Sequence, residues 1–175
     1  MAIVIHEATP DHAEAIREVQ RHTWIATYPN AEYGITKADI EAWFYETPEK
    51  APIRREQRRQ SVATAPFHAW IAMDGETVVG FCMVKQEQQE HLVQALYVLP
   101  EYQGQGVGKR LLQAALQWFG AGKEIVLNVA SYNEKAMAFY CAFGFVPAGI
   151  VAPAETLQLP SGVHLPEIKM VKRSV

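Results

Sequence analysis

Cysteine is scarce in this sequence, and neither positive nor negative charge predominates. Its 175 residues include 2 cysteines and carry a formal net charge of −3. Cys82 and Cys141 lie far apart, form no Cys-x-x-Cys pattern and sit among apolar residues, so we predict two buried free thiols and no disulfide or metal site. A charge so close to balance gives no electrostatic attraction to nucleic acid or to an anionic membrane.

Long apolar runs are also missing, and the N-terminus has no signal-peptide pattern. We therefore expect a soluble, cytoplasmic protein without a membrane partner. What is present is ordinary globular composition, with 49% hydrophobic and 20% charged residues. Because the sequence shows no repeat, low-complexity segment or linker, we predict one folded domain over residues 1–175.

The order of expected elements is mixed α/β. Alternating or apolar runs predict strands at residues 2–8, 67–73, 77–85, 91–99, 124–131, 149–159 and 167–172. Helical spacing predicts helices from Thr9 toward Trp24, from Thr36 through Phe44, and over 53–62, 107–119 and 133–143.

Cap residues mark several of these ends. Thr36 with Asp39 three residues on has the form of a capping box, and the helix that follows should bury Ile40, Trp43 and Phe44. Asn133 has the form of an N-cap. Gly144 stands where a helix end needs a left-handed residue.

The most unusual stretch is QGQGVG, residues 103–108, between a strand and a helix. A Walker A loop fits Gly108-Lys109, but Arg110 stands where Ser or Thr must bind magnesium, and Gln103 replaces its first glycine. The G-x-G-x-x-G fingerprint of dinucleotide-binding proteins does not match, because Lys109 stands at the position of its third glycine. The pattern Q/R-x-x-G-x-G/A matches fully. Bare backbone amides at a helix N-terminus bind anions well, so the stretch indicates phosphate binding.

The wider arrangement resembles a known family. LYVLPEYQGQGVGKRLL, residues 96–112, is similar to the pyrophosphate loop of the GNAT superfamily, the Gcn5-related N-acetyltransferases. NEKAMAFYCAFGF, residues 133–145, resembles the second motif of that family, and the close match covers about residues 77 to 146. The resemblance implies an α/β GNAT fold, with a central mixed, mostly antiparallel twisted sheet whose middle strands splay apart, flanked by helices.

The resemblance also implies an acetyl-CoA-dependent N-acetyltransferase that acts on a primary amine of a small molecule or on an exposed amino group, without a metal. Many small members of the family dimerise, so a homodimer is expected. The acetyl-CoA would lie between the strands of residues 91–99 and 124–131. The residues that match cofactor-binding positions are Leu96, Tyr97, Val98, Gln103, Gly104, Gln105, Gly106, Val107, Gly108, Lys109, Asn133 and Tyr140.

The catalytic candidates are Tyr140, Gln94 and His91. Tyr140 occupies the general-acid position of the family, and a backbone N–H near Leu96 is the candidate oxyanion donor. Many relatives carry Glu near position 94, and the Gln94 amide cannot act as a base. His91 titrates in the right range to work through a water, although a histidine at a strand entrance is more often structural. A non-catalytic acyl-CoA-binding sensor is therefore the alternative.

The candidates for binding the acceptor are two tyrosines and an asparagine. Tyr28 and Tyr33 belong to a loop that, by resemblance, walls the acceptor site, and aromatic faces suit cationic amines. Asn128, on the strand of residues 124–131, could orient the amine. The arginines of residues 54–59 are interpreted as a solvated face balanced by Glu56 and Glu49.

Overall fold

The structure is a computed structural model that describes residues 2–173. Its contacts fall into two compact units. The first joins the residues up to Thr23 with Glu46–Gly120, and the second joins Trp24–Tyr45 with the residues from Ala121 onward. The single domain expected over residues 1–175 stays a prediction.

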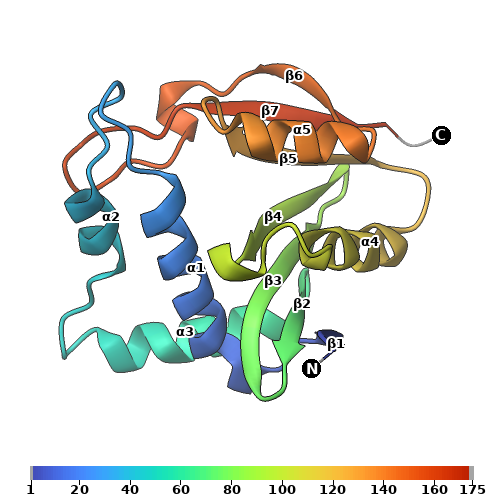
Figure 1. The fold of residues 1–175 in the computed structure, drawn as a ribbon, viewed down its shortest axis with the longest axis horizontal. Coiled ribbons are helices and arrows are strands. Elements are labelled where there is room, and N and C mark those ends of the chain that lie inside the picture. The colour runs from blue at the N-terminus through green and yellow to red at the C-terminus, as the bar shows by residue number, and fades with distance from the viewer. Residues whose placement is uncertain (1, 174–175) are drawn as a thin grey trace. The chain divides into compact units, whose positions relative to one another are not determined.

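The first unit contains four antiparallel strands in the order in which they follow one another along the chain (Figure 1). The strands are β1 (Val4–Glu7), β2 (Phe67–Asp74), β3 (Thr77–Gln86) and β4 (Glu90–Val98). The hairpin expected at Asp74-Gly75 is confirmed, and Gly75 has a φ of 59°, which suits a glycine in a tight turn.

The first unit also contains η1 (Pro10–His12), the first part of α1 (Ala13–Thr27), α3 (Ala51–Ala63), η2 (Pro100–Tyr102) and α4 (Val107–Phe119). The helices α3 and α4 contact β2, and α4 also contacts β3 and β4. The helix α4 buries Leu111, Leu112 and Ala115 completely. A Cβ on Gly80 of β3 would lie 3.3 Å from Leu111 and 3.0 Å from the carbonyl of Tyr97, so this glycine allows α4 to approach the sheet closely.

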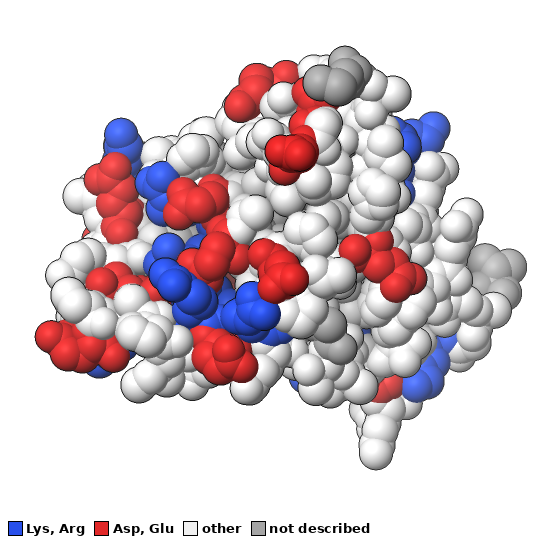
Figure 2. All heavy atoms as spheres, turned by 90° about the horizontal axis from the view of Figure 1, so that it is seen from below, with Lys and Arg blue, Asp and Glu red and all other residues white. Residues whose placement is uncertain are grey.

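Acidic and basic side chains alternate on the face that α3 forms with the start of α1 (Figure 2). Arg58 donates to Glu14 at 2.9 Å and to Glu46 at 2.6 Å, and Arg59 pairs with Asp11 at 2.9 Å. The arginines of α3 therefore pair with residues of other segments of the first unit. Of the two expected partners, Glu56 lies 3.9 Å from Arg59, and balance by Glu49 stays a prediction.

The second unit contains α2 (Lys37–Phe44), α5 (Glu134–Ala142), η3 (Pro153–Glu155) and three antiparallel strands. The strands are β5 (Glu124–Ala130), β6 (Val146–Ile150) and β7 (Glu167–Lys172), in the order β5-β7-β6. Leu127 and Met170 lie opposite each other in the ladder and are 1% and 0% exposed, so they form part of the core of this unit.

The expected strand at residues 149–159 is wrong. The strand β6 begins earlier, at Val146, and ends at Ile150. Pro153 then begins a short 3-10 helix. Proline has no backbone N–H to donate to a ladder, and its fixed φ favours the first position of a helix. The strand at residues 167–172 is confirmed as β7.

The predicted helix ends are confirmed. The amide of Asp39 donates to Thr36 Oγ1 at 3.1 Å, and the Asp39 carboxylate accepts from the Thr36 amide at 3.1 Å. Hydrogen bonds from Thr36 and Ser161 lower the pKa of Asp39. Gly144, after α5, has a φ of 84°. These local interactions fix where α2 begins and where α5 ends.

The predicted burial is wrong for Cys141 and Trp43 and confirmed for Cys82. Cys82, on β3, is buried, and burial raises the pKa of its thiol to about 12. Cys141 is exposed, because it lies on the outer face of α5. Trp43 is 42% exposed, although its ring lies parallel to that of Trp24. Over residues 2–173, none of the helices is both long and apolar enough to cross a membrane.

Candidate functional site

The glycine loop of residues 103–108 needs glycine for its backbone conformation. Gly104 has a φ of 76°, and Gly106, which caps α4, has a φ of 79° and a ψ of 3°. Both lie in the left-handed region, which side chains other than glycine rarely adopt. A Cβ built on either glycine would meet nothing within 4 Å. The loop therefore presents open backbone to its surroundings.

Polar side chains hold this loop on both sides. Gln103 Nε2 donates to the carbonyl of Val98 at 2.9 Å, which ties the loop to the end of β4. Gln105 Nε2 donates to the carbonyl of Glu101 at 2.9 Å. Arg110, in the first turn of α4, donates to the carbonyl of Ile3 at 2.8 Å. The loop is thus held in shape by contacts within the first unit.

The start of α4 suits an anion. The first amides of a helix have no acceptor within it, and the helix dipole is positive at this end. The first turn of α4, all of which the structure describes, contains Lys109 and Arg110 and no acidic residue. A phosphate group beside residues 103–109 would therefore meet backbone donors and two cations.

The strand before the loop has a β-bulge at Gln94. Ala95 lies opposite Met83, whereas Val93 lies opposite the next residue, Val84, so Gln94 is an extra residue in β4. Its side chain is exposed. Bulges redirect side chains and often lie beside active sites. After the bulge, the strand pairs again with β3 at Leu96, Tyr97 and Val98 and then leads to the glycine loop. Tyr97 lies opposite Phe81, and Val98 lies opposite Gly80.

His91 is buried near the start of β4. It is 6% exposed, and its ring stacks on Phe119 of α4, with centroids 4.6 Å apart and an angle of 3° between the planes. This contact explains why a histidine follows directly on the polar loop. Its place in the site stays a prediction, as does that of Gln94.

The second unit contains the other motif. Asn133 Oδ1 accepts from the amide of Ala136 at 3.1 Å, so its predicted N-cap role is confirmed. Tyr140, on α5, is 8% exposed, and its ring meets Phe139 and Phe145 edge-on, with centroids 5.2 and 5.8 Å apart. These rings fix the orientation of Tyr140, the candidate general acid.

Asn128 has a carboxyl partner that the sequence did not reveal. Glu167 begins β7 opposite Ala130, on the same face as Asn128, and its carboxylate accepts a hydrogen bond from Asn128. Burial raises the pKa of Glu167, and the Asn128 hydrogen bond lowers it in part. An acidic residue at the start of an apolar strand was the only signal in the sequence. The exposed Asn128 amide is therefore oriented by β7.

Tyr28 and Tyr33 both contact Tyr132, which sequence reasoning missed. The Tyr132 hydroxyl donates to the carbonyl of Tyr28 at 2.7 Å, and the Tyr132 ring stacks on Tyr33, with centroids 5.2 Å apart. Burial, and to a lesser extent Tyr33, raise the pKa of Tyr132 to about 12. Tyr28 is 8% exposed and packs edge-on against Trp24, whereas Tyr33 is 39% exposed.

The site candidates thus fall into two groups. The first unit holds the candidates on β4 and in the glycine loop, and the second holds Tyr28, Tyr33, Asn128, Asn133 and Tyr140. The splayed opening expected between β4 and β5 stays a prediction. Over residues 2–173, His, Cys, Asp and Glu side chains form no group of three or more that could hold a metal ion.

Several proteins are similar to this chain. The PaiA N-acetyltransferase of Thermoplasma acidophilum, solved in complex with coenzyme A, has the same fold, with a TM-score of 0.69 at 24% identity over 99% of both chains. The N-alpha-acetyltransferase RimI of Mycobacterium tuberculosis is 33% identical over 95 residues, 52% of this chain and 60% of RimI. The peptidyl-lysine N-acetyltransferase YjaB of Escherichia coli is 32% identical over 92 residues, 52% of this chain and 56% of YjaB.

These matches span little more than half the length of the two relatives found by sequence. The pattern of the acetyltransferase (GNAT) family matches much more of this chain, from residue 14 to residue 145. That range includes the glycine loop, the bulged strand β4 and the motif that begins at Asn133. The chain therefore belongs to the GNAT family of acetyltransferases.

Proposed function

We propose that this chain is an acetyl-CoA-dependent N-acetyltransferase that acts on a primary amine, either of a small molecule or of an exposed amino group. The observation that carries the proposal is the glycine loop of residues 103–108. Its two left-handed glycines leave the backbone amides at the start of α4 uncovered. The first turn of α4 has no acidic side chain that would repel a pyrophosphate.

The residues present fit coenzyme A. The amides from Gln103 to Lys109 would bind the pyrophosphate, and the Lys109 charge would strengthen those hydrogen bonds. The backbone of Leu96, Tyr97 and Val98 would pair with the pantetheine arm as an added strand does. Asn133 would add a side-chain contact to the cofactor.

The proposed reaction is acyl transfer. The neutral amine nitrogen attacks the thioester carbonyl carbon, and a backbone N–H near Leu96 stabilises the oxyanion that forms. The carbon–sulfur bond then breaks, and the thiolate takes a proton from the Tyr140 hydroxyl. The nitrogen loses one proton as the amide forms, and this proton restores Tyr140. The products are the acetylated amine and the CoA thiol.

Neither candidate on β4 has the chemistry and exposure of a strong base. Gln94 is an amide, and the ring of His91 is buried against Phe119. We therefore propose that the bound ammonium group loses its proton to water rather than to a protein base, and that the neutral amine then reacts. The logarithm of kcat/KM should then rise with pH, with a slope near one, up to the pKa of the amine, which is about 10 for a lysine-like group.

The names of the relatives support an amine acceptor. RimI is named an N-alpha-acetyltransferase and YjaB a peptidyl-lysine N-acetyltransferase, so both names refer to amino groups of polypeptides. In this chain, Tyr28, Tyr33 and Asn128 are the proposed acceptor contacts. Tyr33 is more exposed than Tyr28, and Asn128 is oriented by Glu167.

Two measurements test this proposal. Isothermal titration calorimetry with acetyl-CoA and with CoA should show binding, and release of the CoA thiol should follow when a panel of primary amines is added. A panel of small polyamines, amino acids and short peptides with a free N-terminus or lysine separates the two acceptor classes. Silence of both CoA ligands in calorimetry contradicts the proposal.

A non-catalytic acyl-CoA sensor is the second candidate, and the exposed Gln94 at the bulge favours it. Tyr140→Phe separates the two. For the enzyme, this variant should still bind CoA but release thiol about 100-fold or more slowly, the range of general acid catalysis. Tight binding by the wild type, without turnover on any amine, supports the sensor. The cytoplasmic location and the homodimer stay predictions.

A further inference from the structure

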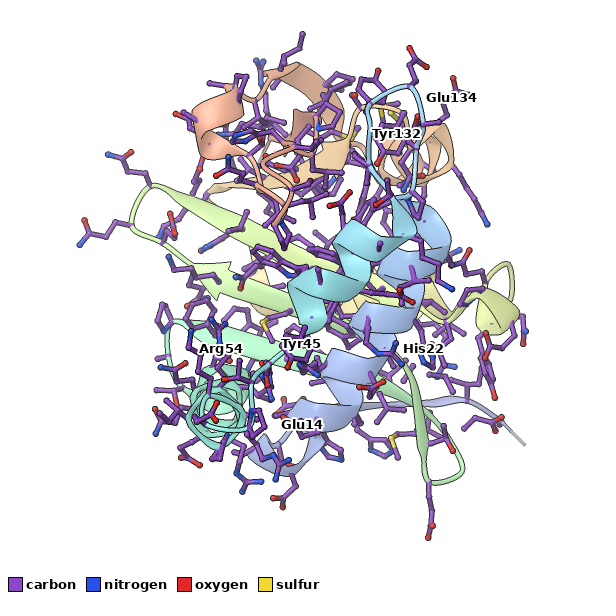
Figure 3. All side chains as sticks on the ribbon, turned by 90° about the vertical axis from the view of Figure 1, so that its left-hand side faces the viewer. Glu14, His22, Tyr45, Arg54, Tyr132 and Glu134 are labelled. Atoms are coloured by element: carbon purple, nitrogen blue, oxygen red, sulfur yellow. The ribbon has the colours of Figure 1, made fainter. Side chains whose placement is uncertain are left out.

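Tyr132 contacts the segment Trp24–Tyr45 in two ways. Its hydroxyl donates a hydrogen bond of 2.7 Å to the carbonyl of Tyr28, and its ring stacks on Tyr33 with 22° between the planes. Figure 3 shows Tyr132 beside the loop that connects α1 to α2, close to Glu134 at the start of α5. One side chain thus contacts this loop at two points, Tyr28 and Tyr33.

The loop itself is an ordered turn. Asn30 and Ile35 exchange two backbone hydrogen bonds of 2.8 and 2.9 Å, and Asn30 Oδ1 accepts from the amide of Glu32 at 3.0 Å. Gly34 has a φ of 68°, which closes the turn. These hydrogen bonds connect the two sides of the loop, so a contact at Tyr28 or Tyr33 bears on the position of both.

A second attachment lies at the other end of the loop. Asp39, which completes the capping box of α2, shares a hydrogen bond with Ser161, and a Cβ on Gly34 would lie 4.0 Å from Val163. Tyr132 thus contacts the loop directly, and residues 161–163 lie beside Gly34 and the start of α2. The ring of Tyr33 remains 39% exposed.

We propose that Tyr132 is a positioning residue for the acceptor: it holds the loop of residues 28–36 so that the exposed ring of Tyr33 meets a cationic amine. This inference rests on the proposed N-acetyltransferase function. One face of the Tyr33 ring is covered by Tyr132, and the remaining surface attracts an ammonium group by a cation–π interaction. The exposed side chain of Glu32, in the same loop, adds negative charge.

The test compares two variants that each remove one tyrosine hydroxyl. Tyr132→Phe keeps the ring but removes the hydrogen bond to Tyr28. Tyr45→Phe is the matched control, because Tyr45 is 71% exposed and has no part in the proposed site. For Tyr132→Phe, KM for the amine should rise about threefold to tenfold, the effect of one neutral hydrogen bond, while KM for acetyl-CoA stays unchanged. Tyr45→Phe should leave both values unchanged.

A second readout does not depend on turnover. Hydrogen exchange at the amides of Asn30 and Ile35 should be about threefold to tenfold faster in Tyr132→Phe, since the loop opens more often without its hydrogen bond. Tyr33→Leu removes the stacking with Tyr132 by changing the loop residue instead, and it should also raise KM for the amine. It serves as the second variant in case Tyr132→Phe does not fold.

The outcomes are distinguishable. If the wild type acetylates an amine and folded Tyr132→Phe keeps its KM for that amine, the positioning role is refuted and the proposed function stands. If the wild type turns over no amine, the proposed function fails, and the positioning role fails with it. A rise in KM for acetyl-CoA equal to the rise for the amine indicates general destabilisation and also overturns the inference.

Discussion

Gly106 provides a test of the glycine loop because its backbone conformation is known and its surroundings are open. With a φ of 79° and a ψ of 3°, Gly106 lies in the left-handed region. Alanine in this region loses about 1–2 kcal/mol relative to a residue that tolerates it. Since a Cβ at Gly106 would meet nothing within 4 Å, Gly106→Ala should add no steric term.

The free energy of unfolding of Gly106→Ala should therefore fall by about 1–2 kcal/mol. In a chain of this size, each kcal/mol corresponds to about 2–4 °C, so Tm should fall by roughly 2–8 °C. Gly106→Asn should lose less, because asparagine adopts the left-handed conformation more readily. Urea denaturation and differential scanning calorimetry measure both variants.

The same variants test the role of the loop in binding. If the alanine shifts the loop enough to remove one charge-assisted hydrogen bond, CoA affinity should fall about tenfold or more in calorimetry. Gly162→Ala is the matched control: Gly162 has a φ of 89°, and its Cβ would also meet nothing within 4 Å. That variant should lose similar stability but bind CoA normally. A Gly106→Ala protein as stable as the wild type, or one equal to Gly106→Asn, refutes this reasoning.

Two further predictions concern pH and thiol chemistry. Burial alone would raise the pKa of Glu46, but its hydrogen bond with Arg58 and the charge of Arg17 lower the pKa below its ordinary value of 4.5. The stability from Glu46 is therefore present above pH 4.5 and lost as pH falls through the lowered pKa. Urea denaturation should show that Glu46→Gln is less stable than the wild type at pH 7 and that the difference narrows as the pH falls below 4.5. Cys141 should react with a thiol reagent within seconds to minutes, whereas the buried Cys82, with its pKa of about 12, should react only on unfolding; rapid labelling of two thiols in the native protein contradicts this.

Features that depend on a few neighbouring residues could be predicted from the sequence. The capping box of Thr36, the N-cap role of Asn133, the left-handed Gly144 and the hairpin turn at Gly75 all follow from the conformations that particular side chains allow. The glycine loop belongs to the same class, since its pattern alone indicated an open backbone before a helix.

Features that depend on partners far along the chain could not be predicted. Cys141 lies in an apolar run, but α5 buries Tyr140 and leaves Cys141 outside. The bulge at Gln94 is visible only once the register with β3 is known. The contact of Tyr132 with Tyr28 joins residues 104 positions apart. Periodicity reports which residues are apolar, but it does not report which element covers them.

The assignment of Trp24–Tyr45 to the second unit has a consequence for how such a protein can diversify. Gln103 in the glycine loop bonds to Val98, and Arg110 just after the loop bonds to Ile3, so both of these hydrogen bonds lie within the first unit. In the second unit, the loop of residues 28–36 is bonded to Tyr132, and Asp39, just after this loop in α2, is bonded to Ser161. Mutations that alter the preference for an amine can therefore accumulate around the second loop without disturbing the bonds that shape the first. Directed evolution toward new acceptors would begin with a library limited to residues 28–36 and 132.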